Sequence, residues 1–218
     1  MAAIRRGLPA MPVGPRRRTW RALVVGLAVS ALLCLGWADS WDAIRGAAAN
    51  VHAIRADFVQ EKHLPMLAHP LISHGKLYYQ RPDSLRWEYT EPVRSVLLMH
   101  AGEARRFVAV DGKLVPDAGM RLEAMQFVMP EISGWLGGRF QDNAMFAATL
   151  EAGNRIQLVP REVGMAKVIQ RIELALADQP GVIKTVRIFE SEDAYTTMTF
   201  VNTTVNPQLD PRIFSEVE

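Results

Sequence analysis

The residue types that most often bind metals or move protons occur in this 218-residue chain without forming a recognisable site. It contains five histidines, and three of them, His63, His69 and His74, lie close together, whereas His52 and His100 stand apart. Zinc sites use short characteristic ligand spacings and commonly cysteine, and the spacings of six and five residues fit none of these patterns. The sequence therefore predicts solvated loop histidines, with no metal and no cofactor.

Nucleophilic and acid–base catalysis have no recognisable set of residues either. The chain has no Gly-x-Ser-x-Gly turn and no glycine-rich phosphate-binding loop. Its Asp and Glu residues alternate with apolar residues, which is typical of the solvated face of a sheet. We predict that the protein is not an enzyme. The alternative, an enzyme acting on lipids, would require acyl turnover by the purified protein.

Arg81 is the charged residue in the most unusual surroundings. The segment 75–89 predicts two strands joined by a tight turn, with Pro82 at the first central position of that turn. Large apolar side chains alternate along both arms, namely Leu77, Tyr79, Leu85, Trp87 and Tyr89. A guanidinium group never loses its charge, so Arg81 needs partners, and the simplest one is a surface carboxylate.

Residues 1–38 have the composition of an export signal. Six arginines and no acidic residue occur there, followed by the apolar run 22–35 and by small residues at the cleavage positions of Gly36-Trp37-Ala38. The run of 14 residues is shorter than the roughly 20 that a membrane span needs, although an uncleaved anchor remains the alternative. We therefore expect a mature chain of residues 39–218 in the periplasm.

Removal of the leader changes the bulk properties of the protein. The 25 basic residues fall to 19 against 23 acidic ones, so the net charge changes from +2 to −4. This negative charge gives no reason to expect a nucleic-acid partner. The single cysteine, Cys34, leaves with the leader, so the mature chain has no disulfide.

The mature chain reads as mainly β (α+β). A short helix is expected at 41–53, capped by Asp39 or Ser40. Period-2 alternation between turn residues predicts strands at 54–61, 75–80, 85–89, 95–100, 106–110, 145–150, 155–159, 169–176, 182–189 and 194–201. Together these predict one domain, 39–218. Its expected architecture is a strongly curved antiparallel sheet, an incomplete barrel, with helices against the concave face.

The segment 120–137 interrupts the strand pattern. Apolar residues recur there at helical spacing, at Leu122, Met125, Met129, Ile132 and Leu136. Pro130 is expected to divide the segment into two short helices. The mature chain keeps eight methionines, a flexible and polarizable residue that suits an ordinary core and also a pocket for ligands of variable shape. Both interpretations stay open on the residues alone.

Several motifs resemble the periplasmic outer-membrane lipoprotein carrier family (LolA-like). They are Ala56-Asp-Phe-Val-Gln60, then Gly75-x-Leu-x-Tyr-x-Arg-Pro-x-x-Leu-Arg-Trp87, then Pro92 and the closing Asp210-x-x-x-Phe214. The resemblance implies an incomplete antiparallel β-barrel with an α-helical lid over a hydrophobic cavity. It also implies a carrier that accepts lipoprotein acyl chains from an inner-membrane ABC transporter and delivers them to an outer-membrane receptor lipoprotein.

The resemblance also assigns candidate site residues. By motif position, Arg81 hydrogen-bonds to lid backbone and keeps the empty cavity closed. The expected cavity lining is Phe58, Leu77, Tyr79, Leu85, Trp87, Leu97, Met99 and Phe107. The inward face is inferred from alternation, and an error of one residue would exchange the whole set.

The chain also departs from the family pattern. Many carriers have Trp-x-Tyr-x-Pro where this chain has 106–111, Phe is common at the position of Leu85, and the chain ends soon after Phe214. These departures indicate a divergent branch, for which we expect a monomer. Two alternatives stay open: a role in a glycolipid or other lipid pathway, and a periplasmic sensor or assembly module without transport.

Overall fold

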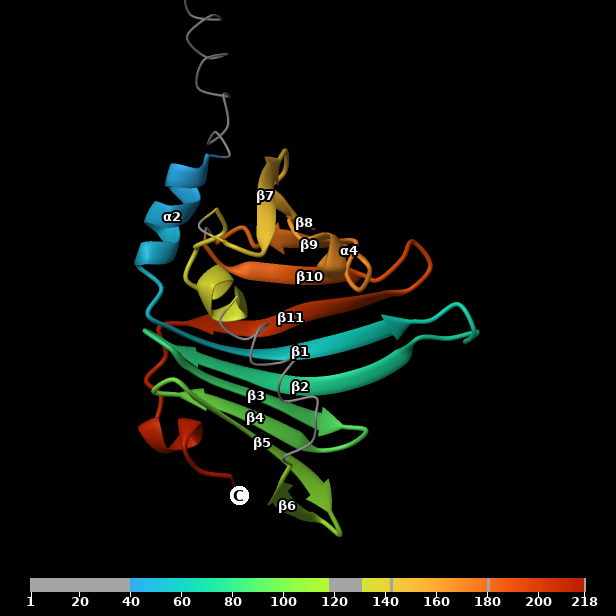
Figure 1. The fold of residues 1–218 in the computed structure, drawn as a ribbon. Helices are drawn as coiled ribbons and strands as arrows, with labels where there is room; N and C mark the ends of the chain where they lie inside the picture. The colour runs from blue at the N-terminus through green and yellow to red at the C-terminus, as the bar shows by residue number, and fades with distance from the viewer. Residues whose placement is uncertain (1–39, 118–130, 142, 180, 218) are drawn as a thin grey trace, which may run out of the picture. The chain divides into compact units, whose positions relative to one another are not determined.

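The computed structural model describes residues 40–117, 131–141, 143–179 and 181–217, which all belong to one compact unit, Asp39–Glu218 (Figure 1). Its eleven strands form one antiparallel sheet in the order β6-β5-β4-β3-β2-β1-β11-β10-β9-β8-β7. The first six strands are β1 (Ala53–His63), β2 (Leu71–Gln80), β3 (Ser84–Glu91), β4 (Ser95–His100), β5 (Glu103–Val110) and β6 (Lys113–Pro116). The others are β7 (Phe146–Glu151), β8 (Arg155–Pro160), β9 (Arg171–Leu176), β10 (Ile183–Phe189) and β11 (Tyr195–Val205). The predicted curved and unclosed antiparallel sheet is confirmed.

Only one strand pairing joins strands that are distant in the described sequence. Each strand of the β1–β6 run pairs with its neighbours along the chain, and so does each strand of the β7–β11 run. The two runs meet where β1 pairs with β11, with Phe58 opposite Phe200. The sheet is therefore two meanders held together by the first and last strands.

Few helices accompany the described part of the sheet. Helix α2 (Trp41–Ala49) begins at Ser40, whose side chain accepts a hydrogen bond from the Ala43 amide at 3.1 Å. It ends four residues before the expected boundary, because β1 starts at Ala53. Residues 131–136 are helical, whereas α4 (Val163–Ala166) and the 3-10 turn η1 (Pro211–Phe214) are single turns. Within these described ranges, no helix has the length and apolar character needed to cross a bilayer.

The predicted segment 120–137 is described only in part. Its end, at 131–136, is helical as expected. The predictions for Leu122, Met125, Met129 and Pro130 lie outside the described residues.

Two strands and one turn differ from the prediction in the first half of the sheet. Strand β2 begins at Leu71 rather than at Gly75, because it pairs with β1 as far as Lys62. Strand β6 was not predicted, because its four residues are too few to show alternation. The Arg81–Pro82 peptide is cis, and Pro82 is the second rather than the first of the three residues between Gln80 and Ser84.

Two hairpin turns follow from local sequence. Ala101-Gly102 has φ values of 51° and 80°, and Asp111-Gly112 has values of 50° and 77°. Positive φ at both central residues is the geometry that matches the twist of paired strands, and Asp-Gly adopts it readily. These turns fix the register between β4, β5 and β6.

The inner face of the sheet carries an aromatic cluster around Phe58. Its ring centroid lies 4.9 Å from that of Trp87 and 5.3 Å from that of Tyr89. Gly75 makes room for the cluster, because a Cβ at this position would lie 2.3 Å from Cζ of Phe58 and 2.2 Å from the Glu88 carbonyl oxygen. The glycine is required here by close approach.

We therefore expect Gly75→Ala to lower the free energy of unfolding by about 1–3 kcal/mol, because the added methyl overpacks a closed core. Urea denaturation of residues 39–218 measures this change. Gly46→Ala is the matched control, since a Cβ at this exposed position of α2 meets nothing within 4 Å. The control should gain up to about 1 kcal/mol from helix propensity. Equal effects of the two substitutions on the free energy of unfolding would contradict the requirement for glycine at position 75.

Candidate functional site

An apolar cavity of about 140 Å³ lies between the inner face of the sheet and the helical residues 131–136. Strands β2, β3, β9, β10 and β11 form its floor, through Leu77, Trp87, Ile172, Ile183, Val186, Ile188, Met198 and Phe200. The remaining lining residues are Glu131, Ile132, Trp135, Leu136, Met145, Phe146, Met165 and Ile169. Glu131 is the only ionisable residue among these described lining residues. Such a cavity favours apolar ligands.

Two of the eight predicted lining residues, Leu77 and Trp87, contact this cavity. Five others are buried in the same core without reaching the cavity, namely Phe58, Tyr79, Leu85, Leu97 and Met99. Their assignment to a lining therefore stays a prediction.

Phe107 does not share the face of the other seven. The register places Leu97 opposite Trp87 and Arg106, whereas Val96 lies opposite Glu88 and Phe107. Residues directly opposite each other in an antiparallel pair share a face. Phe107 is therefore on the outer face with Glu88. Counting alternation within β5 alone missed this shift of one residue, which the β4–β5 turn decides.

Sequence reasoning missed the contribution of the last strands. Val186 and Ile188 of β10 and Met198 and Phe200 of β11 line the cavity beside β2 and β3. Their alternation was visible in the sequence. The cavity lining was nevertheless assigned to the first half of the domain, because most of the family motifs lie there. The alternation of apolar residues in β10 and β11 is the signal that could have identified these lining residues.

Two indole groups, those of Trp87 and Trp135, lie behind the apolar wall of the cavity. Their Nε1 atoms are buried, and no polar atom of the described lining faces the cavity. Trp87 interacts with the Tyr89 hydroxyl, whereas Nε1 of Trp135 has no partner at hydrogen-bond geometry among the described residues. The wall that a ligand would meet is therefore wholly apolar.

Glu131 stands at the edge of the cavity. Its Oε2 accepts a hydrogen bond from Nδ2 of Asn143, and Oδ1 of Asn143 accepts from the amides of Met145 and Phe146 at 2.8 and 2.9 Å. Desolvation by burial raises the pKa of the Glu131 carboxyl, while the Asn143 hydrogen bond opposes that rise. Asn143 thus connects the helical residues 131–136 to the entry of β7.

Arg81 bridges two segments above the inner face. Its NH2 donates to the carbonyl oxygen of Ala48 at 2.8 Å and to that of Gly137 at 3.2 Å. Its NH1 donates to the carbonyl oxygen of Ala49 at 3.3 Å. The first and third carbonyls belong to the last turn of α2, where carbonyl groups lack the usual amide four residues further on. That of Ala48 also accepts from the Val51 amide at 3.0 Å. The multi-donor guanidinium therefore ties α2 to the residues that follow 131–136.

Two glycines let this end of α2 pack closely. Gly138 and Gly181 have φ values of 78° and 79°, and added Cβ atoms would lie 2.3 Å from Cβ and 2.6 Å from the amide nitrogen of Ala48, respectively. Both the backbone conformation and the space at these positions require glycine. The carbonyl that Arg81 binds most closely thus belongs to the residue packed between them.

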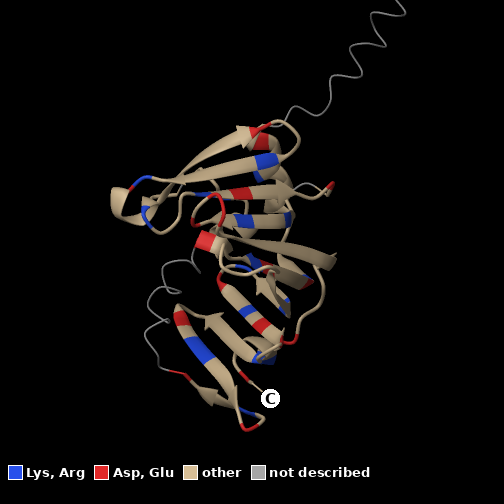
Figure 2. Ribbon diagram, turned by 90° about the vertical axis from the view of Figure 1, so that its right-hand side faces the viewer, with Lys and Arg blue, Asp and Glu red and all other residues tan. Residues whose placement is uncertain are grey.

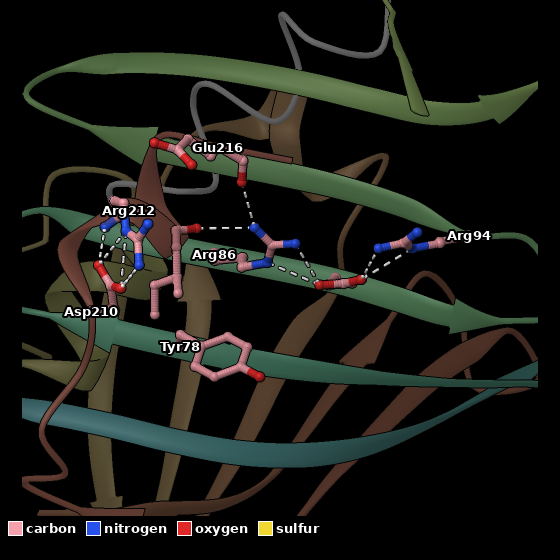
Figure 3. A pocket seen from close by; sticks show the side chains of 8 residues that line it. Tyr78, Arg86, Arg94, Asp210, Arg212 and Glu216 are labelled. Carbon is pink, nitrogen blue, oxygen red and sulfur yellow. Dashed lines mark hydrogen bonds and ion pairs between the residues drawn. The ribbon is translucent and has the colours of Figure 1, made fainter. Parts of the chain in front are cut away.

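A second hollow, of about 270 Å³, lies on the outer face of the sheet beneath the C-terminal segment (Figure 3). Arg86 donates to Oε2 of Glu88 at 2.9 Å and to the carbonyl oxygens of Ile213 and Glu216 at 3.0 and 2.8 Å. Arg94 donates to the other oxygen of Glu88 at 3.2 Å. Glu88 is thus paired with both Arg86 and Arg94, and Arg86 also holds the C-terminal segment against β3.

The outer face therefore corrects one expectation. The carboxylates of the strands were expected on a solvated face, but Glu88 is only 8% exposed. The reason is the C-terminal segment, since its carbonyls at Ile213 and Glu216 bind Arg86, the neighbour and ion-pair partner of Glu88.

We expect Arg86→Leu to lower the free energy of unfolding by about 3 kcal/mol, because it removes one partner of a buried pair. It should also speed proteolysis within residues 210–217, which lose two hydrogen bonds to the sheet. Urea denaturation and limited proteolysis measure the two effects. Arg45→Leu removes an exposed pair with Asp42 and should change stability by less than about 1 kcal/mol. Similar values for both variants would show that Arg86 is no anchor.

The architecture and the cavity define a class of protein: an open antiparallel sheet with an apolar hollow beneath short helices, suited to holding an apolar ligand. Within that class the chain belongs to the LolA family. The sequence profile of the family described as "Outer membrane lipoprotein carrier protein LolA" matches residues 49–216. No curated protein sequence matches the chain significantly.

Solved structures with a similar chain trace have little sequence in common with this protein. A DUF1329 family protein from Desulfovibrio piger is 8% identical, with a TM-score of 0.44, over 80% of this chain and 95% of that chain. A LolA superfamily protein from Nitrosomonas europaea is 9% identical, with a TM-score of 0.40, over 81% and 98%. MucB of Pseudomonas aeruginosa, solved in complex with MucA, is 14% identical, with a TM-score of 0.39, over 79% and 58%.

Proposed function

We propose that this protein is a periplasmic, non-enzymatic carrier that holds the acyl chains of lipoproteins, or of a related lipid, in its inner cavity. The observation that carries the proposal is the apolar cavity between the sheet and residues 131–136 in a member of the LolA family. Residues 1–38 would direct export and be removed, leaving residues 39–218. Carriage from the inner to the outer membrane then requires a donor, for which an ABC transporter is expected, and a receptor lipoprotein.

The size of the cavity supports a closed, empty form. Pockets that enclose ligands of drug size have volumes of roughly 300–1,000 Å³, whereas this cavity has about 140 Å³. A long acyl chain therefore enters only when the helical residues 131–136, which we call the cover, move away from the sheet. Each buried methylene contributes roughly 0.8 kcal/mol, and the free energy of opening offsets part of that gain. The balance would make binding reversible, as a carrier needs.

Two other functions remain in view. A glycolipid or other lipid pathway would use the same cavity with another headgroup. A sensor or assembly module would use the fold to bind a partner protein and would leave the cavity empty. Identification of the bound molecule separates these functions from lipoprotein carriage.

We expect the protein purified from the periplasm to carry acylated lipid or lipoprotein, detected by native mass spectrometry followed by lipid extraction. Val186→Phe fills part of the cavity and should reduce the bound lipid several-fold. Val201→Phe, at an exposed position of β11, is the control and should leave it unchanged. A wild-type protein that is always empty and rejects fluorescent acyl probes would exclude the carrier function.

We propose further that Arg81 latches the cover. Arg81→Leu removes three hydrogen bonds to backbone carbonyls, which are together worth roughly 1–3 kcal/mol at this partly exposed position. Opening, measured by the uptake rate of a fluorescent acyl probe and by hydrogen exchange of residues 44–50, should increase roughly tenfold. Far-UV circular dichroism should stay unchanged.

Arg55→Leu replaces an exposed arginine of β1 and serves as the control for this measurement. Unchanged uptake and unchanged release in Arg81→Leu would contradict the latch.

A further inference from the structure

The connection between β1 and β2 presents an unusual group of exposed apolar side chains. Met66 is 83% exposed, Leu71 is 52% exposed and Ile72 is 51% exposed, and Leu67 beside Met66 is also exposed. Single exposed apolar residues are normal on protein surfaces. Four within one short hairpin concentrate exposed apolar surface at its end, and concentrated apolar surface marks interaction sites. We refer to residues 64–72 as the hairpin tip.

The hairpin tip is a projecting structure with a defined backbone. Strands β1 and β2 pair as far as Lys62 and Leu71, and the Leu67 amide donates to the Leu64 carbonyl oxygen at 3.0 Å. Figure 1 shows that this hairpin extends beyond the connections of the neighbouring strands. A projecting apolar tip suits insertion into a soft apolar medium such as the interface of a bilayer.

The distribution of charged residues in and beside the hairpin tip is also compatible with insertion into a bilayer. Residues 63–75 contain no Asp, Glu, Lys or Arg, so their burial removes no such charge from water. Lys62 and Lys76 flank this span, and no acidic residue lies between them. Behind the tip, His63 stacks on Tyr195 with ring centroids 4.3 Å apart. Tyrosine is enriched at membrane interfaces. Lys62 is already paired with Glu190, with 3.4 Å between Nζ and Oε1, so the tip depends on its apolar side chains for contact with lipid.

Other apolar residues lie at the same end of the sheet. The antiparallel strand order places the β3–β4 connection and the β8–β9 connection at the end where β1 meets β2. Figure 2 looks at this end. Val93 in the first connection and Val163 and Val168 in the second are exposed. The β8–β9 connection also supplies Met165 and Ile169 to the cavity lining, so one wall of the cavity lies at the end that carries the hairpin tip.

We propose that the hairpin tip inserts into the headgroup region of a lipid bilayer and docks the protein on a membrane surface with the adjoining cavity wall toward the lipid. This surface is separate from the cavity that holds the cargo, and binding to a bilayer requires no cargo. The inference therefore goes beyond the carrier function and can be tested without it.

The test measures binding of residues 39–218 to vesicles of phosphatidylethanolamine and phosphatidylglycerol by co-sedimentation. This unit contains every described element, and omission of residues 1–38 removes their own apolar run. The double substitution Met66→Asp, Leu67→Asp should lower the partition coefficient by about tenfold or more, because two apolar side chains no longer enter the lipid. Val115→Asp, at an exposed position of β6, should have no effect.

Two further measurements fix the interpretation. Tryptophan placed by Met66→Trp should be quenched by brominated acyl chains more strongly than the native tryptophans of the wild type. Uptake of an acyl probe from solution should be unchanged in the Asp double variant, which distinguishes loss of docking from loss of carriage. The proposal would be overturned if the wild-type protein did not co-sediment with vesicles. It would also be overturned if the double variant and Val115→Asp lost binding equally.

Discussion

The pairing of β1 with β11 is the interaction on which the rest of the structure depends. It joins two meanders that are otherwise built from neighbours along the chain, and the cavity takes its floor from both of them. Asn206 reinforces the junction, because its Oδ1 accepts from the amides of His52 and Ala53 at 2.7 and 3.2 Å and its Nδ2 donates to the Asn50 carbonyl oxygen at 2.9 Å. This side chain fixes the passage from α2 into β1, and thereby the helix end that Arg81 binds.

Successive residues of strand β3 make different contacts on the two faces of the sheet. Trp87 points to the inner cavity, whereas on the outer face Arg86 binds the C-terminal segment and Glu88 pairs with Arg86. The strand is thus anchored from both sides. The cover above it is tied by hydrogen bonds from Arg81, by the Asn143–Glu131 contact and by packing. Movement that admits a ligand is therefore expected in the cover rather than in the sheet.

The strands were predictable because alternation is a local signal. Residues 155–159 were expected as a strand, and β8 spans Arg155–Pro160. Features set by distant partners were not predictable. The start of β2 depends on β1, the face of Phe107 depends on the β4–β5 register, and the burial of Glu88 depends on residues more than 100 positions away. For the site, the motifs located Arg81 and two lining residues, whereas the contribution of β9–β11 emerged only from the folded sheet.

The central pairing also sets the order of events during synthesis. Ile54 of β1 lies opposite Val205 of β11, so β1 must wait for some 150 residues before its second neighbour exists. Until then, one edge of β1 and half of the cavity floor are uncovered. A chain in this condition has no closed pocket and exposes the residues that would form it. A chaperone that binds the chain before β11 is in place would have to cover these apolar residues.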